Sequence, residues 1–296
     1  MVVQWPVKPF GPKPSPRNEK SLVITTSIAR IRRRLAIGLA LVATATSIVG
    51  QQAGTASAAP AITLPPINAG FDYQITSPYD PPTGVTVVSR DHSAERADGL
   101  YNICYVNGFQ VQPGAESEWP EDLLLRDKDG KVVYDTRWKE ALLDIRTADK
   151  RTRIADKVDQ WIDECANKRF DAVEIDNYDS YSRSKDLLTT DQAVTFISML
   201  AKHSHDRGLA IGQKNAAELV DKRTVAGLDF AVSEECGDTA ECGDYAAAYG
   251  NHVIDIEYTE AGLSAACGGY ASRFSIVLRD VEVSTPGDPG YVRKTC

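Results

Sequence analysis

The chain has 296 residues, of which 43% are hydrophobic and 25% are charged, with 21 glycines and 15 prolines. This composition excludes a disordered or collagen-like protein and allows a large buried core. Because the first 58 residues resemble an export signal, about 240 residues remain for the fold, a length that α/β barrels commonly reach as one domain.

The predicted leader covers residues 1–58. Arg30 and the run Arg32–Arg34 precede an apolar stretch, Leu35–Val49, which is followed by the small residues Ala56–Ala58. A basic region, an apolar region and a small-residue cleavage site are the three parts of a secretory signal. The apolar stretch is shorter than the roughly 20 residues that span a bilayer, so a permanent membrane anchor is the less favoured alternative. We therefore expect a secreted, extracellular protein with no stable membrane partner.

Removal of this leader changes the charge of the chain. The leader carries eight basic residues and one acid, which leaves 25 basic and 40 acidic side chains and a net charge of −15. Such a surface repels nucleic-acid phosphates, so we expect no nucleic-acid partner. The charge favours a cationic or neutral substrate, although an acidic surface also serves solubility alone.

Six cysteines follow the leader, and an even number in an exported protein predicts disulfides. Cys236 with Cys242, and Cys267 with Cys296, are plausible bridges, and Cys104 and Cys165 then remain. The spacing lacks the paired ligands of a zinc site.

Short apolar runs alternate with amphipathic stretches after residue 70. Residues 59–69 are rich in Ala and Pro and are expected to be disordered, and 70–296 are expected to form one domain. The expected strands are Phe71–Thr76, Val85–Ser89, Leu100–Val106, Ala141–Ile145, Phe170–Ile175, Leu209–Gln213, Leu228–Ser233, His252–Ile256 and Phe274–Leu278. The expected helices are Ala148–Lys168, Thr190–Arg207, Ala216–Val225, Ala240–Tyr249 and Glu260–Tyr270.

This alternation predicts a parallel sheet with helices outside it, as in a TIM (β/α)8 barrel or a doubly wound sheet. No glycine-rich dinucleotide fingerprint follows the first strand, which favours the barrel and gives no reason to expect a cofactor. Nine strands are one more than the barrel needs, so one is expected to be an addition or an edge piece.

Polar residues lie at or just after the ends of most expected strands. Because the carboxyl ends of barrel strands form the active site, the pattern predicts a site there. These residues are Tyr73, Gln74, Asp91, Tyr105, Asp176, Asn177, Lys214, Asn215, Glu234, Glu257 and Tyr258. A single such acid is more often a helix cap, but four consecutive strands with this pattern favour a site.

The run 171–179 is the densest part of this pattern. Glu174 and Asp176 share one face of a strand, and Asp179 follows closely. Two acids can bind a cation, so a metal-dependent hydrolase is an alternative, but the spacing is not that of a calcium loop. We expect carboxylate catalysis without a metal.

Several segments resemble glycoside hydrolase family 114, the endo-α-1,4-polygalactosaminidases. They are FDAVEIDNYDSY, GLAIGQKN, LDFAVSEEC and VIDIEY, together with YQIT and LYNICYVNGF near the beginning of the expected domain. The resemblance covers roughly residues 70–280 and implies a TIM barrel that cleaves α-1,4-linked galactosamine polymers. The family's acidic pair matches Asp176 and Glu234. Ser233 and Glu235 stand where the family usually has Asn and often Gln.

The implied chemistry agrees with the matched positions. Glycoside hydrolysis needs one carboxyl group to protonate the leaving oxygen and another to attack the anomeric carbon or activate water. The substrate-binding residues are expected to be Tyr73, Gln74, Asp91, Tyr105, Glu174, Asn177, Asp179, Lys214, Asn215, Glu257 and Tyr258. We expect a monomer that acts on a cationic polysaccharide. A carbohydrate-binding barrel without turnover is the first alternative, before the metal-dependent hydrolase.

Overall fold

The computed structural model describes residues 61–296. The predicted leader, its cleavage site and residues 59–60 lie outside the described residues. Within the described part, none of the helices is both long and apolar enough to cross a membrane.

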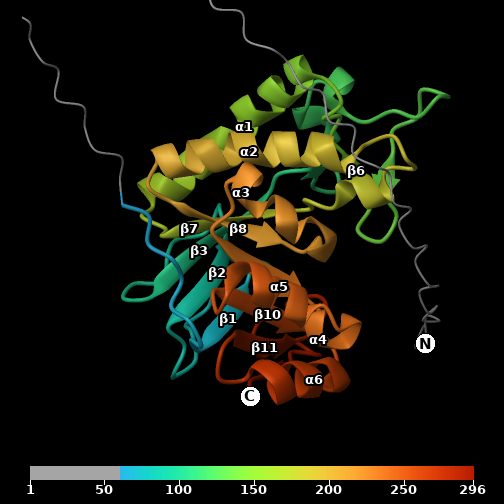
Figure 1. The fold of residues 1–296 in the computed structure, drawn as a ribbon. Helices are drawn as coiled ribbons and strands as arrows, with labels where there is room; N and C mark the ends of the chain where they lie inside the picture. Colours follow the sequence, from blue (N-terminus) through green and yellow to red (C-terminus); the bar gives the residue numbers. More distant parts are fainter. Residues whose placement is uncertain (1–60) are drawn as a thin grey trace, which may run out of the picture. The chain divides into compact units, whose positions relative to one another are not determined.

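Eight parallel strands form the centre of the fold (Figure 1). Their order in the sheet is their order in the chain, as a barrel requires. The strands are β1 (Phe71–Gln74), β2 (Val87–Asp91), β3 (Tyr101–Asn107), β7 (Ala172–Asp176), β8 (Ala210–Lys214), β9 (Phe230–Glu234), β10 (Val253–Glu257) and β11 (Ser275–Arg279). The first and last of them, β1 and β11, lie side by side. The side chain of Arg279 at the end of β11 donates to the carbonyl of Tyr73 in β1.

Each of these strands places alternate side chains inside the curved sheet. Phe71, Val87, Ile103, Phe230 and Ile254 pack together there as an inner core. Gly212 is required in this layer, because a Cβ atom at this position would lie 2.9 Å from the ring of Phe230. The inner layer below the carboxyl ends is therefore tightly filled.

Helices cover the outer face of the sheet after β3 and later strands (Figure 1). They are α1 (Ala148–Asn167), α2 (Thr190–Asp206), α3 (Arg223–Ala226), α4 (Cys236–Thr239), α5 (Cys242–Tyr249) and α6 (Glu260–Tyr270). Threonine caps begin three of them: Thr147 accepts from the Lys150 amide, Thr189 forms a capping box with Gln192, and Thr259 accepts from the Gly262 amide. In α1 the buried residues Ile154, Val158, Ile162 and Cys165 recur every three or four positions on one face.

Two expected helices differ in detail. The stretch 216–225 is mostly a 3₁₀ helix, Ala217–Lys222, followed by the single turn of α3. The helix expected at Ala240–Tyr249 begins two residues later, as α5, because Ala240 adopts a left-handed φ of 61°. The sequence did not predict the short α4 before it, which a disulfide between Cys236 and Cys242 joins to α5.

The expected strand Ala141–Ile145 does not belong to the barrel. It overlaps β6 (Glu140–Leu142), the central strand of a small antiparallel sheet with β4 (Gln110–Val111) and β5 (Tyr134–Asp135). This sheet is inserted between β3 and α1. A further short strand that the sequence did not predict, β12 (Arg293–Lys294), pairs antiparallel with β11.

Residues 61–69 contain no helix or strand, but they contact the body of the fold. The hydroxyl of Tyr101 donates to the carbonyl of Thr63, and the amide of Ala69 donates to Ser275. Pro65 is buried, and its carbonyl bonds with the ring of His252. The described part of this segment therefore differs from the disorder that its composition predicts.

The three disulfides join Cys104 to Cys165, Cys236 to Cys242, and Cys267 to Cys296. They confirm the pairs that we considered plausible. The first ties β3 to α1, and the last ties α6 to the C-terminal residue. All six cysteines are bridged.

Candidate active site

A buried lysine lies at the centre of the carboxyl end of the sheet. The side chain of Lys214, at the end of β8, is only 2% exposed. Its ammonium nitrogen lies 3.0 Å from Glu174 Oε1, 3.2 Å from Asp176 Oδ1 and 3.6 Å from Glu234 Oε2. Burial alone would lower the lysine pKa, but these acids raise it well above its ordinary range. We call these four residues the lysine cluster.

Asp176 is held as an anion within this cluster. Tyr105 donates to its Oδ2 at 2.6 Å, and the amide of Asn177 donates to its Oδ1 at 2.7 Å. Burial acts to raise the pKa of Asp176, but the Lys214 ammonium and these two hydrogen bonds outweigh it and lower the pKa below its usual range.

Glu234 is the more accessible acid, since its side chain is 25% exposed against 18% for Asp176. The hydroxyl of Tyr258 donates to Oε1, and Asn215 Nδ2 donates to Oε2 at 3.0 Å. The amide of Glu234 in turn donates to Asn215 Oδ1 at 2.8 Å. Asn215 thus fixes both the backbone and the side chain of this acid.

Glu174 lies one layer deeper and is fully buried. It accepts hydrogen bonds at 2.9 Å from Tyr73 and from Ser89. Burial raises the pKa of Glu174, and Lys214 opposes that rise. The sequence analysis did not single out Ser89, although its place two residues before Asp91 on the inner face of β2 was a usable signal.

The backbone turns sharply after each of the strands β7, β8 and β9. Asn177, Asn215 and Glu235 have left-handed φ angles of 65°, 50° and 63°. Asparagine adopts this conformation more readily than most residues, whereas glutamate adopts it with strain. The turn at Asn177 directs its amide back onto the Asp176 carboxylate. Local strain therefore occurs beside the acids, as is common at functional sites.

The small antiparallel sheet adds an acid that the sequence analysis missed. Asn177 Nδ2 donates to Glu140 Oε2 at 3.3 Å and to Asn107 Oδ1 at 3.0 Å. Burial raises the pKa of Glu140 to about 7. Glu140 is the first residue of β6, in the inserted sheet, so the pattern of polar residues at the ends of barrel strands did not indicate it.

Two expected substrate-binding residues point to the outside of the barrel. Gln74 alternates with the inward-facing Tyr73 and instead bonds with Asp72 and Arg90 on the outer side of β1. Glu257 packs against Gly237 and Gly262, which belong to the helix layer. Both strands, β1 and β10, are buried on both faces, so the position of these residues at a strand end did not tell which face each side chain would take.

The remaining expected residues are at the carboxyl ends, with structural partners. Asp91 accepts from the amide of Ser93 at 2.9 Å, which stabilises the turn after β2. Asp179 forms a two-contact pair with Arg183, and Arg183 Nη2 also donates to Asn177 Oδ1.

A metal alternative receives no support from the donor set. The ammonium of Lys214 already lies between the carboxylates and would repel a cation there. In residues 61–296, the group with metal-like spacing is Cys236, Cys242 and Asp255, but its two sulfurs are joined in a disulfide and offer no thiolate.

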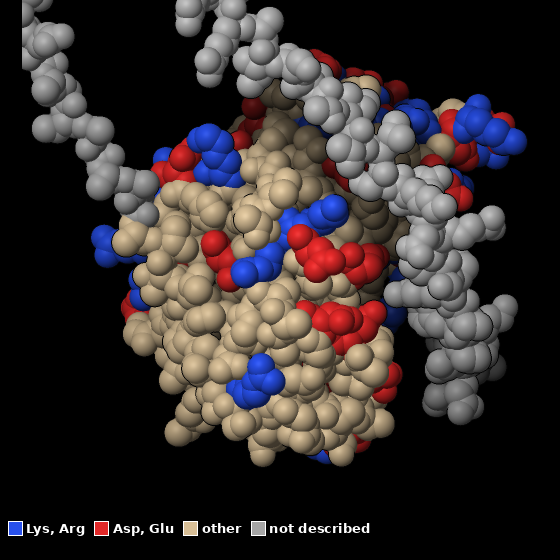
Figure 2. Space-filling view, in the orientation of Figure 1, with Lys and Arg blue, Asp and Glu red and all other residues tan. Residues whose placement is uncertain are grey.

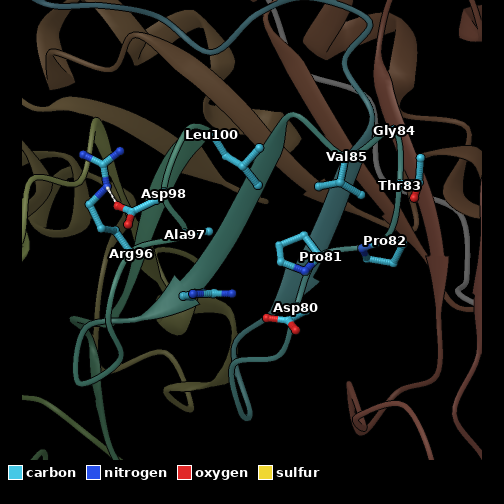
Figure 3. Close-up of a pocket in the computed structure, with 11 residues that line it drawn as sticks. Asp80, Pro81, Pro82, Thr83, Gly84, Val85, Arg96, Ala97, Asp98 and Leu100 are labelled. Atoms are coloured by element: carbon cyan, nitrogen blue, oxygen red, sulfur yellow. Dashed lines mark ion pairs between the residues drawn. The ribbon is translucent and has the colours of Figure 1, made fainter.

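A separate pocket of about 500 Å³ lies between the loops that lead into β2 and β3 (Figure 3). Arg96 and Asp98 form an ion pair of 3.7 Å at its edge. Val85 and Leu100 line it and precede the starts of these strands, so the pocket lies toward their amino ends. It contains none of the lysine cluster.

On the face drawn in Figure 2, acidic side chains occur in groups on a largely uncharged surface. Glycosidases use two carboxyl groups, one of them ionised. Asp176 and Glu234 provide such a pair at the carboxyl ends of barrel strands.

Comparisons with known proteins agree with this geometry. Two solved structures have the same fold: Aspergillus fumigatus Ega3 in complex with galactosamine, and the glycoside hydrolase domain of PelA from Pseudomonas aeruginosa. The first is 22% identical with a TM-score of 0.64, covering 82% of this chain and 100% of the other. The second is 12% identical with a TM-score of 0.53, covering 74% and 97%.

A search of the curated proteins found no match. The model of glycoside-hydrolase family GH114, in contrast, matches residues 51–296 and so includes both acids and every strand of the barrel. The chain therefore belongs to glycoside-hydrolase family GH114.

Proposed function

We propose that this protein is a secreted, monomeric hydrolase that cleaves α-1,4-linked, galactosamine-rich polysaccharide within the chain, with Asp176 and Glu234 as its catalytic pair. The observation that carries the proposal is the position of Lys214 between these two acids. The family and the galactosamine bound in the structure of Ega3 support the substrate class. The three disulfides support an oxidising, extracellular location.

The separation of the acids favours a retaining mechanism. Asp176 Oδ1 and Glu234 Oε2 lie 3.2 and 3.6 Å from the same nitrogen, so they are at most about 7 Å apart. Retaining enzymes hold their carboxyl groups about 5–5.5 Å apart, and inverting enzymes hold them about 6.5–9.5 Å apart. This bound supports the retaining range over the upper part of the inverting range.

In this mechanism Asp176 is the nucleophile, because Lys214, Tyr105 and the Asn177 amide keep it ionised. It attacks the anomeric carbon while Glu234 gives a proton to the departing glycosidic oxygen. Glu234 then takes a proton from water, and the water oxygen displaces Asp176 from the anomeric carbon. The hydroxyl of Tyr258 can donate to Glu234 or accept from it, so it remains bonded in both protonation states.

The cluster also suits a cationic sugar. Three acids surround one lysine, so the site keeps an excess of negative charge that attracts the ammonium group of galactosamine. Tyr73, Tyr105 and Tyr258 line the same space through their bonds to these acids. Tyr258 is partly exposed and offers its ring face to a sugar or its ammonium, whereas Tyr73 and Tyr105 are buried and position the acids.

The deciding assay measures reducing ends released from deacetylated galactosaminogalactan. We expect long products to appear first, as in internal cleavage, with unchanged activity after chelator treatment. A folded protein that binds the polymer and releases no ends would instead be a carbohydrate-binding barrel. Loss of activity after chelation would support the metal-dependent alternative.

A further inference from the structure

The turn between β5 and β6 exposes a large aromatic residue that the proposed mechanism does not use. The side chain of Trp138 is 43% exposed, whereas Trp119 is only 5% exposed. An exposed tryptophan leaves a broad apolar ring in water, and such rings are enriched at binding surfaces. The turn therefore presents a ring that is available to a ligand.

This turn is held rigidly. Asp135 Oδ1 accepts from the amides of Arg137 at 2.8 Å and Trp138 at 3.4 Å. The amide of Lys139 donates to the carbonyl of Asp135 at 2.8 Å. The Arg137 guanidinium lies over the Trp138 ring, 5.2 Å from its centre. A ring fixed in this way loses little conformational entropy when a ligand binds.

The same turn is fastened to the loop after the catalytic strand β7. Arg183 forms an ion pair of 2.7 Å with Asp135 and donates to Asn177 Oδ1 at 3.0 Å. Asn177 directly follows Asp176. At the far end of the turn, Glu140 accepts from Asn177 as well. Both ends of the turn are therefore tied to the residue next to the proposed nucleophile.

These contacts place the turn beside the loop that carries Asp176, at the rim of the site. Burial raises the pKa of Glu235, and the guanidinium of Arg137 opposes that rise. Glu235 directly follows Glu234, so the charge of the turn also acts on the loop after β9.

We propose that Trp138 is a stacking platform at the rim of the cleft, which binds an uncharged pyranose unit of the polymer a short distance from the bond that is cleaved. The proposal rests on the proposed function and assigns a binding subsite to it. A sugar stacks its C–H face on the ring face that Arg137 leaves free. The guanidinium disfavours an ammonium group beside it, so this position selects an N-acetylated or amine-free unit, whereas the lysine cluster attracts the ammonium form.

The test measures binding directly, in the Glu234→Gln background, so that it does not depend on turnover. Calorimetry compares disaccharides with longer oligosaccharides, each fully deacetylated or partly N-acetylated. Trp138→Ala should weaken binding of the longer, partly acetylated oligosaccharides by roughly 5- to 10-fold and leave the disaccharides unchanged. Trp138→Phe should restore most of the loss. In the active enzyme, Trp138→Ala should raise KM and leave kcat unchanged.

A matched control lies on the same hairpin. Tyr134 is 40% exposed and precedes Asp135 in β5, so its side chain lies on the opposite face of the strand from the one that pairs with Arg183. Tyr134→Ala should not change binding. Arg137→Gln should reduce the preference for the acetylated oligosaccharide.

Equal loss in the Tyr134 and Trp138 variants, or wild-type affinity of Trp138→Ala for long oligosaccharides, would overturn the subsite. An unchanged acetyl preference in Arg137→Gln would overturn its selectivity. If the wild-type enzyme cleaves no galactosamine polymer although the Glu234→Gln protein binds one through Trp138, the proposed function fails and the subsite stands.

Discussion

Two groups of buried acids lie only one strand apart and behave differently. The lysine cluster faces the inside of the barrel, and the outer acid pair, Asp255 and Glu257, faces the helices behind β10. In the first group, Lys214 lowers the pKa of Asp176. In the second, burial raises the pKa of Glu257 to about 8, and Asp255 adds to the rise. A neighbouring cation therefore reverses the effect of burial on the pKa of Asp176, whereas Glu257 has no cation to oppose its burial.

The outer acid pair is also incompletely bonded. Ser233 donates to Asp255 at 2.8 Å, and the Gly237 amide donates to Glu257 at 2.6 Å. The second oxygen of each acid has no partner among the described residues. Burial is the main reason that both pKa values are raised, and a proton held on Glu257 provides a hydrogen bond to Asp255. The pair is suited to structure rather than to nucleophilic attack.

The largest effect should come from the two proposed catalytic acids. Asp176→Asn and Glu234→Gln keep the shape of each side chain and remove its proton chemistry, so each should lower kcat by at least about 10³-fold. Circular dichroism should show an unchanged fold. The exposed Glu118→Gln is the control and should keep full activity. Near-normal turnover in either variant would remove that residue from the pair.

Replacement of Lys214 should make the lysine cluster resemble the outer acid pair, because its acids would then have no neighbouring cation. Lys214→Met leaves Glu174, Asp176 and Glu234 buried together without their counter-charge. We expect roughly 3–5 kcal/mol lower stability and activity near the detection limit, measured by urea unfolding and the reducing-end assay. The exposed Lys222→Met should change neither quantity. Wild-type stability in Lys214→Met would show that the lysine is not what holds these acids.

Neutralising the outer acid pair should raise the stability of the fold, whereas Lys214→Met should lower it. The folded chain keeps the Glu257 proton up to about pH 8, whereas the unfolded chain releases it near pH 4.5, the ordinary value. The stability from this group is therefore complete below pH 4.5 and is lost as pH rises toward 8. Glu257→Gln removes the loss and offers Asp255 an N–H donor.

We expect Glu257→Gln to be more stable than the wild type at pH 8 by roughly 2 kcal/mol, or about 5 °C in Tm, with little gain at pH 4. Scanning calorimetry at both pH values measures the difference. Activity should be unchanged, because the Glu257 side chain points outward, away from the lysine cluster. The same gain at both pH values would refute a role for its ionisation.

Sequence patterns predicted the position of the lysine cluster but not that of the outer acid pair. Asp176, Lys214 and Glu234 end successive parallel strands, and strand ends meet at one edge of a barrel, so their proximity was predictable. Glu257 also ends a strand, but β10 is buried on both faces and its sequence does not reveal that Glu257 points outward. Glu140 and Trp138 lie in the inserted sheet, whose position depends on tertiary contacts such as the Arg183–Asp135 pair.

The salt dependence of KM should show whether the negative charge of the lysine cluster attracts the substrate or only keeps the protein soluble. Added salt shortens the Debye length from about 10 Å at 0.1 M to 3 Å at 1 M. KM for deacetylated polymer should therefore rise with salt by roughly a few-fold, while kcat changes little, because the cluster is shielded. Fully N-acetylated polymer should be the poorer substrate. Equal kcat/KM for both polymers without salt dependence would mean that the charge only keeps the protein soluble.

The most direct test of the ionised nucleophile uses the Glu234→Gln variant with an activated galactosaminyl fluoride, which needs no acid to leave. The first step should then proceed and the second should stall, so a covalent sugar ester should accumulate. Peptide mass spectrometry is predicted to find this ester on Asp176. A sugar on another carboxyl group, or no adduct while the fluoride is hydrolysed with inversion, would contradict the account.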